Sequence, residues 1–203
     1  MIKLYSFPLS GHAHRVHLML SLLNVEHETI EVNLAEGEQG SEGFLKLNPF
    51  HHVPVLEDDD LVIRDSNAIV AYLARKYDEQ WYPTDAKSTA KIQEWLAVAT
   101  KEIVAGPANA RLVNVFGADM DSEALIANSH ELFAIIEAHL SKHSWFANDE
   151  KSIADVAMYT YIAHAPEGGV SLEAYPNIRV WLKRVEALDG FVAMQKTAVG
   201  LAA

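Results

Sequence analysis

The first 34 residues place a helix-like segment between two strand-like segments. Residues 2–7 (IKLYSF) and 28–34 (ETIEVNL) alternate and carry β-branched or aromatic side chains, which is the pattern of a half-buried strand. Apolar residues recur at helical spacing between them: Val16, Met19, Leu20 and Leu23. Because a crossover helix joins parallel strands, we expect a β-α-β unit.

A hairpin and another helix follow this unit. The segments 53–57 (VPVLE) and 61–64 (LVIR) flank three consecutive aspartates, which predicts two antiparallel strands joined by an acidic turn. A helical pattern then begins with Ala68, Ile69, Tyr72 and Leu73. The expected order is β-α-β-α-β-β-α, so we predict that residues 1–80 form an α/β domain with a mixed four-stranded sheet and helices packed on it.

The second half of the chain shows only helical patterns. Apolar side chains recur at helical spacing from Ser88 onward, which predicts an all-α domain over residues 88–203. Residues 81–87, with Tyr82-Pro83-Thr84-Asp85, read as the linker between the two domains. Within the helical half, Ala105-Gly106-Pro107 interrupts one pattern and is expected to bend that helix.

Composition excludes several classes of function. Half of the 203 residues are hydrophobic, enough for a sizeable core, and the formal net charge of −12 would repel a nucleic-acid backbone. No leader-like segment and no run near the roughly 20 apolar residues of a membrane span is found, so we expect a cytoplasmic protein with no membrane partner. The chain has no cysteine, so sulfur chemistry would need a sulfur supplied by a substrate.

Three local motifs fall where a ligand of an open α/β sheet would bind. Pro8-Leu9-Ser10-Gly11 joins the first strand to the first helix. Val53-Pro54 opens the third strand, where proline is tolerated and a cis bond is plausible. Asp65-Ser66 precedes a helix whose first N–H groups form an anion site. Each motif alone is explained by helix capping or by the start of a strand. Together, however, the three lie at the same end of the sheet, where they could hold an elongated ligand.

Two other groups of polar residues have structural explanations. Ser152 and Asp155 have the spacing of a capping box, with Asp in place of Glu, ahead of a buried helix. His14 and His17 share a helix face and His51 and His52 are adjacent, but zinc usually needs three or four convergent ligands. We therefore predict no metal site.

The chain resembles the cytosolic glutathione transferases over nearly its full length. The resemblance is carried by "PLSGHAHRVHLML", "FLKLNPFHHVPVLEDDDLVIRDSNAIVAYLARKY" and "SIADVAMYTYI", and it is greatest to the serine-type bacterial and plant classes. It implies a thioredoxin-like N-terminal domain, a helical C-terminal domain and a homodimer. It also implies glutathione as cosubstrate, with no tightly bound cofactor, and a small hydrophobic electrophile as the second substrate.

By the same resemblance, Ser10 donates its hydroxyl hydrogen to the glutathione thiolate, with Tyr5 as a less favoured alternative. Val53, which directly precedes Pro54, offers its backbone N–H and C=O to the cysteinyl unit of glutathione. Asp65 and Ser66 hold the γ-glutamyl end, and the sequence leaves open whether Asp65 meets the amine or caps the helix.

The glycyl end departs from the family pattern. Where plant-type relatives carry a His-Lys pair and a Gln before Val-Pro, this chain carries Gln39-Gly40 and His52. We expect His52 to meet the glycine carboxylate, either as an imidazolium or as a neutral N–H donor, with His51 second.

The electrophile pocket is expected to draw on both halves. Its predicted walls are Leu9, His12, Arg111, Val115 and Phe116, although core packing explains the apolar members equally well. Glutathione-dependent peroxidase or isomerase activity within the family, and a non-catalytic binding or regulatory protein of the same fold, are the alternatives to a transferase.

Overall fold

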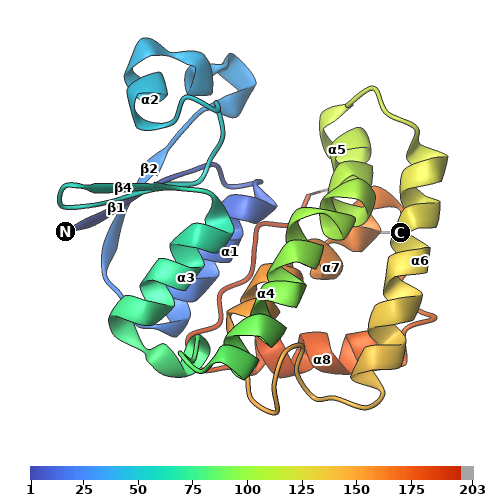
Figure 1. Ribbon diagram of the computed structural model, residues 1–203. Coiled ribbons are helices and arrows are strands. Elements are labelled where there is room, and N and C mark those ends of the chain that lie inside the picture. The colour runs from blue at the N-terminus through green and yellow to red at the C-terminus, as the bar shows by residue number, and fades with distance from the viewer. Residues whose placement is uncertain (198–203) are drawn as a thin grey trace.

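The computed structural model describes residues 1–197, and its N-terminal half is built on a four-stranded sheet (Figure 1). The strands are β1 (Ile2–Ser6), β2 (His27–Glu31), β3 (Val55–Asp58) and β4 (Leu61–Arg64), in the spatial order β2-β1-β3-β4. β1 is parallel to β2, whereas β3 is antiparallel to β1 and β4. The predicted mixed sheet is confirmed.

The two faces of the sheet are covered by different helices. These helices are α1 (Gly11–Leu22), α2 (Glu42–Leu47) and α3 (Ser66–Tyr77). Leu4 of β1 lies opposite Leu56 of β3, and both belong to the core shared with α1 and α3. Because successive strand residues point to opposite faces, Tyr5 and Val55 lie on the other side, in a smaller cluster with Phe44 of α2.

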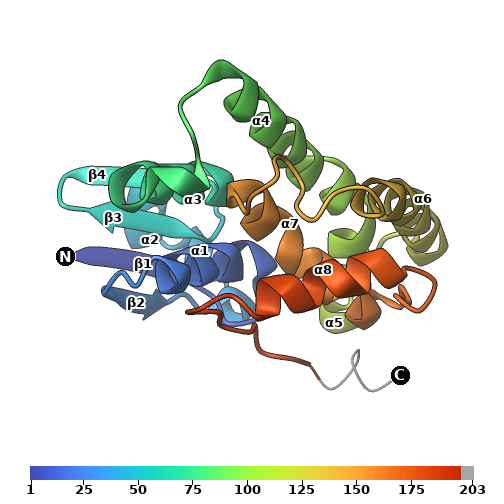
Figure 2. The same ribbon diagram turned by 90° about the horizontal axis from the view of Figure 1, so that it is seen from below.

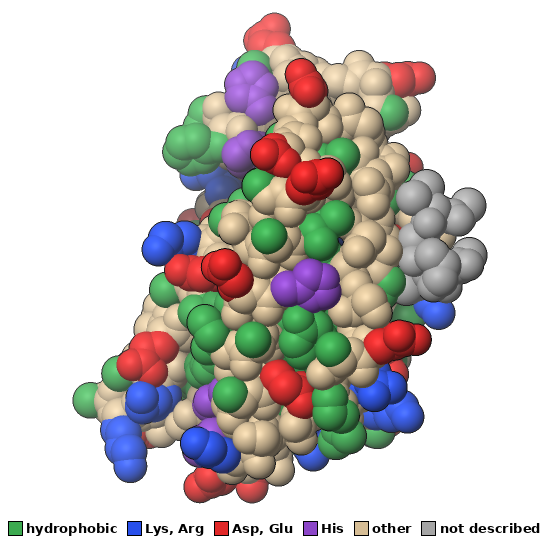
Figure 3. All heavy atoms as spheres, turned by 90° about the vertical axis from the view of Figure 1, so that its right-hand side faces the viewer, with side chains coloured by type: hydrophobic (Ala, Val, Ile, Leu, Met, Phe, Trp, Pro, Cys, Tyr) green, Lys and Arg blue, Asp and Glu red, His purple; other side chains and the backbone are tan. Residues whose placement is uncertain are grey.

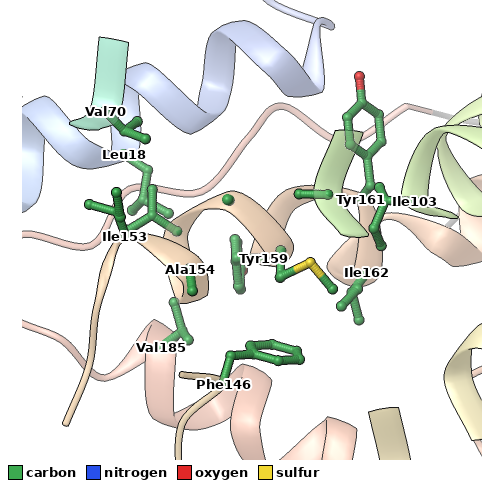
Figure 4. Packing of buried hydrophobic residues seen from close by; sticks show 14 of the residues in the cluster. Leu18, Val70, Ile103, Phe146, Ile153, Ala154, Tyr159, Tyr161, Ile162 and Val185 are labelled. Atoms are coloured by element: carbon green, nitrogen blue, oxygen red, sulfur yellow. The ribbon is translucent and has the colours of Figure 1, made fainter. Parts of the chain in front are cut away.

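The second half is all-helical, as predicted. Its helices are α4 (Ala86–Thr100), α5 (Asn109–Phe116), α6 (Ser122–Leu140), α7 (Ile153–Ala163) and α8 (Pro176–Glu186). α7 is buried around its whole circumference, including its polar residues Asp155 and Thr160, and it lies among the other helices (Figure 2). Ile153 of α7 lies beside Leu18 and Val70 of the sheet domain, while Val185 and Phe146 lie on its other side (Figure 4).

The expected bend occurs between α4 and α5. Residues Val104–Ala108 form a π-type turn in which Gly106 leaves helical geometry, with φ −126° and ψ −106°. A Cβ on Gly106 would lie 3.0 Å from the hydroxyl oxygen of Ser129 in α6, so a larger residue would press on that helix. The bend gives α5 its own direction, which lets its side chains reach the turn before α1.

The predicted capping box begins α7. The Ser152 side chain accepts from the backbone at the start of the helix, and the Asp155 carboxylate accepts from the backbone N–H of Ser152. α3 ends at Tyr77 and α4 begins at Ala86, but a domain boundary at residues 81–87 stays a prediction. Among residues 1–197 no helix is long and apolar enough to cross a membrane.

Candidate active site between the two halves

A cavity of about 970 Å³ lies where the sheet domain meets α4 and α5. It is lined by the turn before α1, the segments around residues 34–39 and 48–54, the start of α3, the bend after α4, and α5. The predicted residues that it brings together are Leu9, Ser10, His12, Gln39, His52, Val53, Pro54, Asp65, Ser66, Arg111 and Phe116. The three sequence motifs therefore share one cavity.

Ser10 is the N-cap of α1 and also lines the cavity. Its Oγ accepts a hydrogen bond from the backbone N–H of Ala13 at 3.2 Å. A hydroxyl has one donor hydrogen besides its acceptor lone pairs, and within the described residues no acceptor takes the Ser10 hydrogen. Ser10 can therefore cap the helix and still donate to a ligand, so the two explanations of this serine are compatible.

Tyr5, the alternative hydroxyl, is directed elsewhere. Its hydroxyl donates to Glu57 Oε2 at 2.5 Å on the sheet face that carries α2, and Tyr5 is not among the residues that line the cavity. Burial, together with the bond to Glu57, raises the pKa of Tyr5 to about 12. Tyr5 is thus engaged within the protein and away from the cavity.

The segment before β3 forms one wall. The Val53–Pro54 peptide bond is cis, in agreement with the sequence, and β3 begins just after it at Val55. His52 is exposed, and its carbonyl oxygen accepts from Asn48 Nδ2 at 2.7 Å. Gln39 lines the same side, and its Oε1 is buried with no hydrogen-bond partner in the described part of the chain.

Asp65 is the N-cap of α3. Its Oδ1 accepts from the backbone N–H groups of Asn67 and Ala68 at 2.9 and 3.0 Å, and its φ of 78° is unusual for a residue with a side chain. Such backbone strain concentrates at functional sites. The structure thus shows that Asp65 caps the helix, which the sequence left open.

Ser66, the first residue of α3, is held by a buried arginine. Its Oγ accepts from Arg15 Nη1 at 2.7 Å, and the same guanidinium also donates to Asn67 Oδ1 and to the carbonyl oxygen of Ala157. Because Arg15 occupies one acceptor position, the Ser66 hydroxyl hydrogen remains a donor. Sequence reasoning missed Arg15, since a long-range pairing leaves no local pattern.

His12 lies beside Ser66, on the side predicted to hold the γ-glutamyl end. Its Nδ1 is 3.5 Å from Ser66 Oγ and from Arg15 Nη1, and its ring meets Tyr161 edge-on at 5.0 Å between centroids. Burial, with smaller contributions from Arg15 and His52, lowers the pKa of His12 to about 3. His12 is therefore a neutral imidazole at neutral pH.

The structure does not bring Val115 to the cavity. Val115 lies about 100° round α5 from Phe116, and Leu112, one turn before Phe116, takes the expected place. Arg64 at the end of β4 is a further lining residue that sequence reasoning missed. Its signal was a basic residue directly before the acid-serine pair.

The cavity differs in charge from the rest of the molecule. The chain carries a net charge of −12, and acidic side chains are spread over the whole face seen in Figure 3. The ionisable residues that line the cavity include two arginines, three histidines and only one carboxylate: Arg64, Arg111, His12, His51, His52 and Asp65. Because His12 is neutral and Arg111 is paired with the buried Glu167, the cationic excess is smaller than this count, but the lining still repels an anionic ligand less than the acidic surface does.

The histidines of α1 are accounted for by contacts within the protein. His14 bonds Thr160 Oγ1 at 2.8 Å and the carbonyl oxygen of Val192 at 2.9 Å, and His17 bonds Ser6 Oγ at 2.9 Å. Among residues 1–197 no group of three His, Asp or Glu side chains is placed to hold a metal ion.

A thioredoxin-like domain followed by an all-helical domain, with a cavity between them, is the architecture of the glutathione S-transferases. Models described as "Glutathione S-transferase, N-terminal domain" and "Glutathione S-transferase, C-terminal domain" match residues 1–75 and 116–189. The chain is 32% identical over 189 residues to "Glutathione S-transferase D7" of Anopheles gambiae, covering 89% of this chain and 84% of the relative. The chain belongs to the cytosolic glutathione transferase family.

Solved structures show the same similarity. A glutathione S-transferase from Pseudomonas fluorescens superposes with a TM-score of 0.91 at 29% identity, covering 96% of this chain and 99% of that one. A glutathione transferase homologue from Drosophila mojavensis with bound glutathione superposes with a TM-score of 0.84 at 31% identity, covering 92% and 88%.

Proposed function

We propose that this protein is a glutathione transferase that stabilises the glutathione thiolate for attack on small hydrophobic electrophiles. The observation that carries the proposal is Ser10, whose Oγ accepts from Ala13 while its hydroxyl hydrogen remains free to donate into the cavity. A free cysteine thiol has a pKa near 8.5, so little is ionised at neutral pH. Lowering that pKa by about 2 units corresponds to about 2.7 kcal/mol, which a hydroxyl donor and the helix N-terminus together can supply.

The lining suits each part of the tripeptide. Glutathione carries two carboxylates and one ammonium, so its net charge is negative, and a lining with one carboxylate repels it less than the acidic surface of the protein does. The Ser66 hydroxyl and the Ser66 backbone N–H would receive the γ-glutamyl carboxylate, since the next two amides of α3 already donate to Asp65. Val53 would pair with the cysteinyl backbone, and the His52 ring and the side-chain amide N–H of Gln39 would donate to the glycyl carboxylate.

The electrophile would lie against the helical half. Leu9, Leu112 and Phe116 supply apolar surface there, and the Phe116 side chain is 46% exposed. An exposed aromatic ring at the mouth of a cavity is suited to bind an apolar molecule. The chemical class of electrophile is therefore small and hydrophobic.

The proposal is tested by binding and turnover with the purified protein. We expect S-methylglutathione to bind in a calorimetric titration, and glutathione to be conjugated to an aryl halide activated by nitro groups. Absence of binding would contradict the proposal. Binding without turnover of aryl halides, hydroperoxides or other electrophiles would favour the non-catalytic alternative.

We expect Ser66→Ala to raise the glutathione KM by about 5- to 10-fold and to change kcat by less, because a contact far from the sulfur acts equally in the ground and transition states. Steady-state kinetics at saturating electrophile measure both constants. Ser129→Ala is the control, since the Ser129 hydroxyl is also buried but donates to the carbonyl oxygen of Leu125 within α6. A loss confined to kcat would contradict the role given to Ser66.

We also propose that the protein is a cytoplasmic homodimer, as the family resemblance implies. Sedimentation equilibrium of the purified chain measures the assembly state directly. A mass equal to one chain of 22.5 kDa at micromolar concentration would rule out a stable dimer.

A further inference from the structure

Arg111 of α5 reaches across the cavity wall to the turn that presents Ser10. Its side chain is only 2% exposed, and its Nη1 donates to the carbonyl oxygen of Leu9 at 2.9 Å. Leu9 directly precedes Ser10 in a turn closed by the bond from Ser10 N–H to the Phe7 carbonyl oxygen. A side chain of the helical half therefore fixes the backbone immediately before the serine.

The guanidinium is itself anchored by a buried carboxylate. Arg111 Nε donates to Oε2 of Glu167, which is fully buried in the 3₁₀ turn Ala165–Gly168. Burial acts to raise the pKa of the Glu167 carboxyl group, but hydrogen bonds from Thr197 and Arg111 lower it by more. The pKa of Glu167 is therefore below its ordinary value. The two opposite charges compensate one another, and the planar arginine fork directs its N–H groups at two different partners.

Close packing of the backbone fixes the distance between these two residues. A Cβ on Gly168 would lie 2.7 Å from the backbone N of Arg111 and 2.9 Å from the backbone C of Ala110. The 3₁₀ turn thus rests directly on α5, which only a glycine at this position permits. Glu167 and Arg111 are held on two elements that cannot separate without breaking this contact.

The segment after α8 joins the same network. It runs back along α1 (Figure 2), where Ser21 Oγ donates to the Gly190 carbonyl oxygen at 2.6 Å and His14 bonds the Val192 carbonyl oxygen. At its end, the N–H and hydroxyl of Thr197 donate to Glu167 Oε1 at 2.7 and 3.0 Å. Both oxygens of Glu167 therefore have donors, which restricts the positions open to its carboxylate.

We propose that Arg111 is a positioning residue that holds the Leu9–Ser10 turn in the geometry in which the Ser10 hydroxyl donates to the thiolate, with Glu167 as its anchor. The inference rests on the proposed function, because it acts through Ser10. The strength of a hydrogen bond to a thiolate depends on its distance and direction. If the Leu9 carbonyl is no longer held, the turn can move, and the Ser10 hydroxyl then stabilises the thiolate less. Arg111 then affects the thiol pKa without contacting glutathione.

The test is the pKa of the thiol in bound glutathione, followed by the ultraviolet absorbance of the thiolate in native protein, Arg111→Gln, Glu167→Gln and Ser10→Ala. We expect Arg111→Gln to raise that pKa by about half to one unit, which is a 3- to 10-fold smaller thiolate fraction at low pH. The acid limb of the pH profile of kcat/KM for the electrophile, measured at saturating glutathione, is expected to move to higher pH by the same amount. The affinity for S-methylglutathione is expected to stay within about 3-fold, since the peptide contacts remain.

Glu167→Gln separates positioning from a direct charge effect. If the charge of Arg111 acted on the thiolate through space, removing its neutralising partner would lower the thiol pKa. If Arg111 acts by position, loosening its anchor raises the pKa, in the same direction as Arg111→Gln. If Arg111→Gln does not fold, Glu167→Gln still tests the proposal.

Arg75→Gln is the matched control. Arg75, like Arg111, donates to a backbone carbonyl, that of Pro83, and each has one Nη without a partner in the described chain, but Arg75 does not line the cavity. We expect it to lower thermal stability without moving the pH profile. Arg111 variants whose thiol pKa equals the native value, or that change only the KM of the electrophile, would overturn the inference while Ser10→Ala still shifts the pKa. An unshifted Ser10→Ala would overturn the Ser10 role and the inference together.

Discussion

Ser10→Ala is expected to lower kcat for glutathione conjugation by about 10- to 200-fold, because the donor that stabilises the thiolate is removed. The Ser10 Oγ also accepts from Ala13 N–H, and loss of that cap costs about 1 kcal/mol of stability. The fold is therefore expected to survive. The pKa of the bound thiol should rise toward its value near 8.5 in free cysteine, and this is measured from thiolate absorbance against pH.

Two comparisons make this result interpretable. Ser41→Ala removes the N-cap of α2, where Ser41 Oγ accepts from Phe44 N–H at 3.2 Å, and it is expected to cost similar stability with no change in the thiol pKa. Affinity of Ser10→Ala for S-methylglutathione is expected to stay within a few-fold, since that ligand has no thiol proton. A Ser10→Ala protein with native turnover and native thiol pKa would contradict the proposed role.

The fold could be predicted from local patterns because its elements depend on local periodicity and on turn residues. The boundaries are predicted less accurately: the pattern starts the third strand at Val53, whereas β3 starts at Val55, after the proline that cannot donate within a sheet. The second strand was expected to reach Leu34 but ends at Glu31. There Val32 remains buried as the chain turns away, and burial alone resembles a strand pattern.

The motifs proposed to bind glutathione could be predicted from the sequence, whereas the long-range hydrogen bonds that hold them could not. Ser10, Val53 and Ser66 stand at element ends that the sequence marks with turn and cap residues, so their meeting in one cavity follows from topology. Arg15 and Glu167 act through partners about fifty residues or more away, 51 for Arg15–Ser66 and 56 for Arg111–Glu167. No local spacing encodes such a contact.

The predicted wall of the electrophile pocket is only partly correct. The expected wall residue Val115 is replaced by Leu112, because the lining side of this segment follows Ala108, Leu112 and Phe116 at i, i+4 and i+8, and Val115 lies about 100° away from that row. Phe116 and Arg111 do line the cavity, as predicted. Arg111 does so because its long side chain reaches the Leu9 carbonyl oxygen, and not because it supplies apolar surface.

Asp155→Ala is expected to lower the free energy of unfolding by about 3–5 kcal/mol at pH 7, because it leaves four buried donors without an acceptor. The carboxylate accepts from Phe146 N–H and Trp181 Nε1 through Oδ1, and from the N–H and hydroxyl of Ser152 through Oδ2. Urea denaturation followed by tryptophan fluorescence measures the loss. Asp121→Ala is the control, since its Oδ1 caps α6 at an exposed position through one bond from Ala124 N–H, and a loss of about 1 kcal/mol is expected there.

The pH dependence of that loss separates the carboxylate's charge from its hydrogen bonds. Burial raises the pKa of Asp155 to about 6, although its four donors lower it. A group whose pKa is higher in the folded state than in the unfolded state contributes most stability at low pH and loses it as pH rises through the folded value. The difference between native protein and Asp155→Ala is therefore expected to be about 1 kcal/mol larger at pH 5 than at pH 7. Equal losses at both pH values would show that the four donors already offset burial, so that the carboxylate is ionised in the core throughout this range.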